Sequence, residues 1–192
     1  MASQPSSSMA SVQKAAVHLI ITGGTIDSFY DGASDTVIPR KQSILPQYFR
    51  GLRLSTKVRF STVCMKDSRR LTTRDVSDVL RLIERSPEKK IIVTHGTYTL
   101  PDTARYLHRH LHRRDCTVVL TGSMTPLDSF ALSDAGFNLG YAFSQVLVLP
   151  SGVHVCMNGR AFDPDDVIKI LYEGRFSSIM GEHSPTHRKS GK

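Results

Sequence analysis

The chain of 192 residues is long enough for one mid-sized α/β domain and short for two. It is 40% hydrophobic and 22% charged, which supports a packed core and excludes a disordered or acidic solvating protein. Lysine and arginine total 25 against 17 acids, and the net charge of +8 leaves anionic partners open without requiring them.

The N-terminal segment, residues 1–16, is rich in serine and is expected to be a loose tail. The first acid in the chain is Asp27, as in a mitochondrial presequence, but Lys14 is the only lysine or arginine before it. A cytoplasmic protein is therefore favoured, with mitochondrial import as the alternative. No apolar run approaches the ~18 residues that a membrane span needs, so no membrane partner is expected.

The cysteines are few and scattered. Cys64, Cys116 and Cys156 lie in or beside apolar runs, and their spacing fits neither a disulfide framework nor a zinc site. Buried thiols in a reducing compartment are expected.

The first predicted element is a buried parallel strand. Residues 17–21 form a short apolar run that stops near Gly23 and Gly24. Residues 27–40 hold Asp, Gly, Ser and Pro without periodicity and are expected to form a long loop, of the kind that often covers a site.

A second strand and a helix follow. Residues 56–64 are rich in β-forming residues. Thr72 or Thr73 then caps a helix that ends at Arg85, before Pro87. The apolar side of this helix carries Val76, Val79, Leu80 and Ile83.

The later elements repeat the same alternation. A strand at residues 91–93 precedes a helix that Pro101 opens and that continues to about Arg113. The remaining expected elements are a strand at 116–120, a helix at 134–145, a strand at 153–157 and a short helix at 164–172. The fold class is therefore α/β, a doubly wound and mainly parallel sheet of Rossmann-like type, spanning residues 17–180. Residues 181–192 are expected to form a basic polar tail.

Three predicted strands end in glycine and small hydroxyl residues, at 22–25, 94–97 and 121–123. Glycine lets backbone N–H groups approach a ligand, and the hydroxyls of Thr25 and Thr97 lie beside those groups. Two threonines in one cleft suit a hydrolase with a threonine nucleophile. Threonine is also a common helix cap, so a structural role stays open. A phosphate-binding loop is excluded by the missing lysine and the short glycine spacing.

These turns resemble the active-site segments of the bacterial-type L-asparaginases and related amidohydrolases. The resemblance covers about residues 17–180 and is to the large N-terminal domain of that family. Its segments occur in the family's order, at residues 21–26, 94–99, 120–126, 133–139, 157–160 and 166–169.

The resemblance implies hydrolysis of a small amide without metal or other cofactor. It implies that Thr25 is the nucleophile, that Thr97 is the second catalytic threonine and that Lys169 activates Thr97. The backbone amides of Gly24 and Thr97 are expected to hold the reacting carbonyl oxygen.

Further positions match the family's substrate-binding residues. Asp67 and Ser68 follow the second strand, where the family binds the substrate carboxylate, and Gly96 lies in the second threonine turn. Tyr30 matches a tyrosine on the mobile loop after the first motif.

Tyr98 departs from the pattern, because the family carries there an aspartate that anchors the substrate's α-ammonium. Losing that charged hydrogen bond weakens asparagine binding by about ten- to a hundred-fold. Tyr98 is expected to fill the vacated space, with donation of a hydrogen bond by its hydroxyl as the alternative. The substrate is then an amide or related acyl compound with a carboxylate, for which Arg69 and Arg70 are suited. Most of the family also has a smaller C-terminal domain that helps to close the site, which the resemblance does not include.

Arg105, Arg109 and Arg113 are spaced by four and predict one basic helix face. This face either binds an acidic or nucleic-acid partner or is merely solvated. His108 and His112 have the spacing of a metal pair, but no third ligand is visible.

Two hypotheses follow. One is an asparaginase-like amidohydrolase that forms a homodimer or tetramer. The other is a catalytically degenerate relative that binds a ligand or serves as an assembly subunit, for example in an RNA-containing complex. A Lys169 amine within about 3 Å of Thr97 favours the first, because proton transfer needs hydrogen-bond reach.

Overall fold

The computed structural model describes residues 16–181. The two expected tails, residues 1–16 and 181–192, lie outside the described residues except for Ala16 and Gly181.

A six-stranded sheet in the order β4-β1-β5-β6-β7-β8 forms the centre of the molecule. Five strands are parallel, and β8 pairs antiparallel with β7. The predicted mainly parallel α/β fold is confirmed. The strands are β1 (Ala16–Gly23), β4 (Lys57–Lys66), β5 (Lys90–Thr94), β6 (Thr117–Thr121), β7 (Gly152–Met157) and β8 (Arg160–Phe162).

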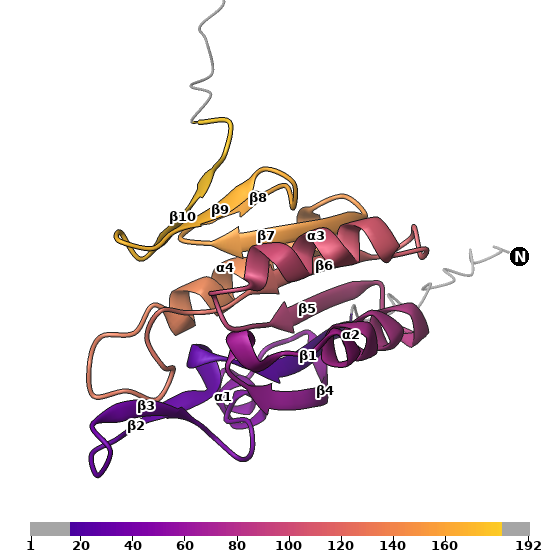
Figure 1. Ribbon diagram of the computed structural model, residues 1–192. Coiled ribbons are helices and arrows are strands. Elements are labelled where there is room, and N and C mark those ends of the chain that lie inside the picture. Colours follow the sequence, from indigo (N-terminus) through magenta and orange to yellow (C-terminus); the bar gives the residue numbers. More distant parts are fainter. Residues whose placement is uncertain (1–15, 182–192) are drawn as a thin grey trace, which may run out of the picture.

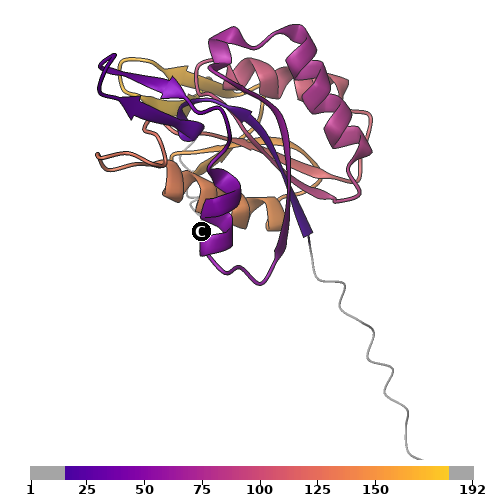
Figure 2. The same cartoon turned by 90° about the horizontal axis from the view of Figure 1, so that it is seen from below.

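Helices cover both faces of this sheet (Figure 2). They are α1 (Leu45–Gly51), α2 (Thr73–Arg85), α3 (Leu100–His110) and α4 (Ala135–Val148). Alternate residues of β1 serve the two layers: Ile20 packs with the α2 and α3 side chains, whereas Leu19 and Ile21 pack with α1 and α4. Both faces of the strands are thus buried, which explains their continuous apolar runs.

The strand order creates a topological switch point at β1. From β1 the chain crosses to β4 on one side, and it then returns to β5 on the other side of β1. Ligands bind at such a switch point, beyond the carboxyl ends of the two central strands. In Figure 1 the arrowheads of β5 and β7 point to the side of the molecule where the hairpin of β2 (Ser28–Asp31) and β3 (Thr36–Pro39) also lies.

The segment predicted as a long loop at residues 27–40 is instead structured. A 3-10 turn, η1 (Thr25–Asp27), leads into an antiparallel hairpin of β2 (Ser28–Asp31) and β3 (Thr36–Pro39). The loop prediction was wrong because β-forming residues flank the polar turn on both sides, and Asp35 adopts the positive φ of 49° that the reversal requires.

The short helix predicted at residues 164–172 is also wrong. The chain there forms β9 (Val167–Ile170), which pairs antiparallel with β10 (Arg175–Ser178). Val167 and Phe176 are buried in the same core layer as α3, and the Arg105 guanidinium donates a hydrogen bond to the Val167 carbonyl at 2.8 Å. Tertiary packing of β-branched residues therefore overrides the helical spacing. The short helix α1 was not predicted.

The predicted basic face does not form one continuous surface. Helix α3 ends at His110, so Arg113 lies beyond it and is tucked against Asp115 with 15% of its side chain exposed. Arg105 forms an ion pair with Asp102 and donates a hydrogen bond to the β9 backbone. Arg109 pairs with Asp165 at 3.6 Å. A nucleic-acid partner across these three arginines is not supported.

All three thiols are free. Cys116 and Cys156 are buried and Cys64 is half-buried. Burial raises the pKa of Cys156 to about 12 and that of Cys64 to about 11, so both stay protonated at neutral pH. Among the helices of residues 16–181, none has both the length and the apolar character of a membrane span.

The start of α2 carries a capping box that is tied to the sheet. Thr72 Oγ1 accepts the Asp75 N–H, the Asp75 carboxylate accepts the Thr72 N–H, and Lys66 Nζ at the end of β4 bonds both carboxylate oxygens at 2.7 and 2.9 Å. Burial raises the pKa of Asp75, but the hydrogen bonds from Lys66 and Thr72 outweigh it and bring the pKa down to about 2.

Because the folded pKa of Asp75 lies below its ordinary value of 3.8, this carboxylate stabilises the fold above pH 3.8 and loses that contribution as the pH falls to about 2. We expect Asp75→Asn to flatten the fall in unfolding free energy over this pH range, measured by urea titration. The control is Asp78→Asn, which removes an exposed pair with Arg81 on the same helix. Equal acid sensitivity of the Asp75→Asn variant and the parent would contradict the assignment.

Candidate active site

Two glycine turns meet at the carboxyl ends of β1 and β5. Gly24 has a φ of +83°, and a Cβ added to it would lie 2.4 Å from the Gly96 nitrogen. Ile21 pairs with Thr94 in the sheet, so the two turns leave neighbouring strands at the same level. This contact brings together the segments that carry Thr25 and Thr97.

The Gly24 N–H donates to the Lys66 carbonyl at 2.8 Å. It is therefore not available to a carbonyl oxygen of a ligand, and the oxyanion role expected for Gly24 is wrong. Gly24 contributes the close approach of the two turns instead. The Thr97 N–H has no hydrogen-bond partner within residues 16–181.

Ser68 brings the end of β4 to the same place. It is buried, and a Cβ on Gly96 would lie 2.7 Å from the Ser68 Cβ. Thr99 Oγ1 donates to the Ser68 carbonyl at 3.1 Å, and the Thr99 N–H approaches Ser68 Oγ at 3.4 Å. Three strand ends therefore converge on the Gly96 turn.

The buried side chain of His95 holds the Gly96 turn in place, a role that the sequence reasoning missed. The side chain is fully buried, and burial lowers its pKa to about 4, so it is neutral at pH 7. Its Nδ1 donates to the Gly96 carbonyl at 2.8 Å, which leaves Nε2 to accept the Thr103 hydroxyl at 3.0 Å. The sequence signal for this role was a histidine placed between the end of an apolar strand and a glycine.

The third turn supports the first two. A Cβ on Gly122 would lie 3.3 Å from the Thr97 Cγ2, so glycine leaves room for the threonine. The Gly122 carbonyl accepts the Asn138 Nδ2 at 3.1 Å, and Asp134 accepts both that amide and the N–H groups after Ser123.

Lys169 contacts Thr97 directly. Its Nζ lies 2.7 Å from Thr97 Oγ1, and Thr97 is only 5% exposed. Strand β9 carries Lys169 to this position and is held against α3 by Arg105. Burial lowers the pKa of Lys169, and the positive charge of Arg69 lowers it further. A larger neutral fraction suits this amine to accept a proton from a hydroxyl.

A charged cluster lies at the outer side of the same turn. Asp67 accepts hydrogen bonds from the Arg69 N–H at 2.8 Å, from Nε at 3.0 Å and from the Nη2 at 3.1 Å. The hydrogen bond from the Arg69 side chain lowers the pKa of Asp67. The guanidinium lies over the Tyr98 ring, 5.6 Å from its centroid. Tyr98 is 52% exposed, so it does not fill a buried space as expected.

The interactions of Tyr30 and Thr25 do not test the catalytic roles expected for them. Tyr30 lies on β2, its hydroxyl donates to Asp35, and its ring packs edge-on against Phe130 at 5.1 Å. Within residues 16–181, Tyr30 forms no hydrogen bond with Thr25 or Lys169. Thr25 begins η1 and is partly buried. The catalytic roles of both residues stay predictions.

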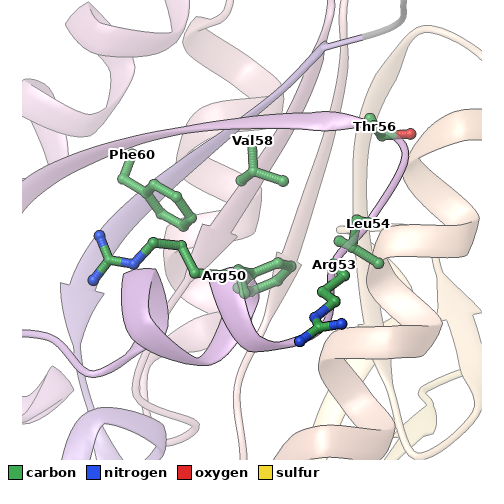
Figure 3. A pocket seen from close by; sticks show the side chains of 7 residues that line it. Arg50, Arg53, Leu54, Thr56, Val58 and Phe60 are labelled. Carbon is green, nitrogen blue, oxygen red and sulfur yellow. The ribbon is translucent and has the colours of Figure 1, made fainter.

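Other features of the surface do not belong to this site. No group of three or more His, Cys, Asp or Glu side chains suited to a metal ion occurs in the described part of the chain. A cavity of about 180 Å³ lies between α1 and the start of β4, at the other end of the sheet (Figure 3). It is lined by Phe49, Arg50, Arg53, Leu54, Thr56, Val58 and Phe60.

Comparison with known proteins gives consistent matches. The family model described as "Asparaginase, N-terminal" matches residues 16–179. A probable L-asparaginase of Deinococcus radiodurans is 32% identical over 158 residues, 79% of this chain and 47% of that protein. A glutaminase-asparaginase of Acinetobacter glutaminasificans is 38% identical over 103 residues, 50% of this chain and 28% of that protein.

Solved structures show the same fold. The thermostable L-asparaginase from Thermococcus kodakarensis superposes with a TM-score of 0.74 at 26% identity, covering 85% of this chain and 51% of that one. The probable cytoplasmic L-asparaginase from Campylobacter jejuni gives 0.72 at 24% identity, covering 86% and 53%. The chain thus spans about half the length of these structures and less than half of the curated relatives.

We expect Gly24→Ala to destabilise the protein by at least about 2 kcal/mol, because the new Cβ meets the Gly96 backbone at a positive φ. The control is Gly140→Ala in the middle of α4, where the Cβ meets nothing within 4 Å. This control is expected to stabilise by about 0.5–1 kcal/mol. Urea unfolding measures both changes, and a Gly24→Ala variant as stable as the parent would show that the turns do not need this contact.

Proposed function

Because the chain belongs to the asparaginase family, we propose that it is an amidohydrolase that uses threonine to hydrolyse a small amide. The observation that carries the proposal is the 2.7 Å contact between Lys169 Nζ and the buried Thr97 hydroxyl. It joins a base of lowered pKa to a hydroxyl at the switch point of the sheet, where ligands of this fold class bind.

In the first half of the proposed reaction, Thr25 Oγ1 attacks the amide carbon and forms an acyl ester. The C–N bond breaks, and the nitrogen takes up the threonine proton and leaves as ammonia. The Thr97 N–H, which is free within the described residues, is suited to stabilise the oxyanion that forms on the carbonyl oxygen.

In the second half, a water molecule loses a proton to the Thr97–Lys169 pair and attacks the ester carbon. The ester bond breaks, the acid is released, and the Thr25 oxygen recovers a proton. Neutral Lys169 is the form that accepts the proton, so the lowering of its pKa by burial and by Arg69 favours this step.

The alternative of a non-catalytic subunit predicted a Lys169 turned to solvent and a site blocked by Tyr98. Lys169 instead bonds Thr97, and Tyr98 is half exposed. No observation favours the alternative over the hydrolase.

Replacing Lys169 by Met is expected to lower kcat for amide hydrolysis by about 10²- to 10⁴-fold, because the proton acceptor is lost. Thr25→Ala and Thr97→Ala are expected to lose activity at least as strongly. Ammonia release is measured with asparagine, glutamine and their des-amino analogues. The matched controls are Lys57→Met, at the start of β4 and away from the site, and Thr56→Ala, at the residue just before that strand. If the parent releases no ammonia from any of these amides, or the three site variants match the controls, the proposal fails.

The pH dependence tests the role of Lys169 separately. Since the neutral amine of the free protein is active, kcat/KM should rise with pH and reach its midpoint below the ordinary lysine value of 10.5. Arg69→Gln removes a positive charge that lowers this pKa, so the midpoint should move to higher pH. An unmoved midpoint in the Arg69→Gln variant would contradict the assignment of this limb to Lys169.

A further inference from the structure

Resting on the proposed function, we infer that Arg69 binds a carboxylate of the substrate. We further infer that the site takes monoamides of short dicarboxylic acids that bear no ammonium group beside that carboxylate. Succinamate is the simplest member of this class, and succinate is the matching product.

The guanidinium of Arg69 is held in one place before any ligand arrives. Asp67 bonds its Nε and Nη2 edge as well as its backbone N–H, and the Tyr98 ring supports its flat face. A fixed, planar guanidinium presents its remaining N–H donors at low entropic cost, and carboxylate is the ligand that this geometry suits.

The Nη1 edge of Arg69 is open. Within residues 16–181 it has no hydrogen-bond partner, and two thirds of the side chain, 66%, is exposed. The outer side of the Gly96 turn therefore carries a fixed cation with unused donors.

This cation lies at the catalytic turn. Arg69 follows Ser68, which packs on Gly96, and its stacking partner Tyr98 follows Thr97. Arg69 is also close enough to Lys169 to affect the protonation of its amine. A small molecule whose amide oxygen is held by the Thr97 N–H can thus extend its other end to Arg69.

The charges of the same cluster disfavour a substrate ammonium. The carboxylate facing this turn is Asp67, and both of its oxygens already accept from Arg69. The other charges at the turn, Arg69 and Lys169, are positive and repel an ammonium. An α-amino acid amide such as asparagine would place its ammonium in this field, whereas the des-amino compound does not.

Product binding tests the inference without requiring turnover. Isothermal titration calorimetry of the full chain with succinate and with L-aspartate is expected to show succinate binding about ten- to a hundred-fold more tightly. Arg69→Gln should remove most of the succinate affinity, by about ten-fold or more. Arg53→Gln, an exposed arginine in the distant cavity of Figure 3, is the matched control and should leave it unchanged.

A second variant separates loss of binding from loss of folding. Tyr98→Asp supplies a carboxylate where the ring now supports Arg69, and it should shift the preference from succinate towards aspartate. Tyr98→Phe keeps the ring under the guanidinium and should retain the parent's preference for succinate. A Tyr98→Asp variant with the parent's preference would overturn the role of this position.

The outcomes distinguish the two proposals. Tighter binding of succinate than of aspartate, without ammonia release from any amide, would support the carboxylate site and overturn the hydrolase. Hydrolysis of asparagine, together with aspartate binding as tight as that of succinate, would support the hydrolase and overturn the inferred substrate class. If neither acid binds, or Arg69→Gln binds succinate as the parent does, the carboxylate site is overturned.

Discussion

The contact between Gly24 and Gly96 is the constraint on which the candidate site depends. The two turns follow neighbouring strands, β1 and β5, and a single added Cβ at Gly24 would fall inside the Gly96 backbone. Their close approach brings the segment that begins with Thr25 against the one that ends in Thr97. Neutral His95, fixed between the Gly96 carbonyl and Thr103 of α3, keeps the second turn in place from the core side. The site is therefore a property of the sheet's switch point rather than of a mobile loop.

The lysine proposed as the base, Lys169, reaches this point from a different part of the fold. Lys169 stands on β9, which belongs to a two-stranded unit outside the main sheet. That unit is fixed by Arg105 to the Val167 carbonyl and by Asn158 Oδ1 to the Phe176 N–H. Asn158 is linked in turn, through its own N–H, to Asn138 on α4. A chain of hydrogen bonds thus connects α4 and α3 to the hairpin that presents the base, so changes at these tethers act on Lys169 without touching it.

The sequence predicted the parallel strands and their glycine turns well, because apolar runs that stop at glycine carry a local signal. It also predicted that Thr25 and Thr97 lie close together, because the carboxyl ends of parallel strands lie on the same side of a sheet. The β9 hairpin was missed because its stability comes from Val167 and Phe176 in the core rather than from local spacing. The bond of the Gly24 N–H to Lys66 and the stacking of Arg69 on Tyr98 depend on long-range register, which a single sequence does not reveal.

Arg69 connects the chemistry of the base to the identity of the substrate. Its charge lowers the pKa of Lys169 while the site is empty, because two cations lie near each other. A bound carboxylate on Arg69 offsets that charge and so makes protonation of Lys169 easier once the substrate is in place. In the empty site the charge of Arg69 therefore raises the neutral fraction of the Lys169 amine, and the loaded site strengthens this base when a proton must be accepted. A substrate ammonium would oppose this strengthening, because a third positive charge again disfavours protonation of Lys169. The charges of Arg69 and Lys169 therefore decide together which substrate is preferred and how readily Lys169 accepts a proton through Thr97.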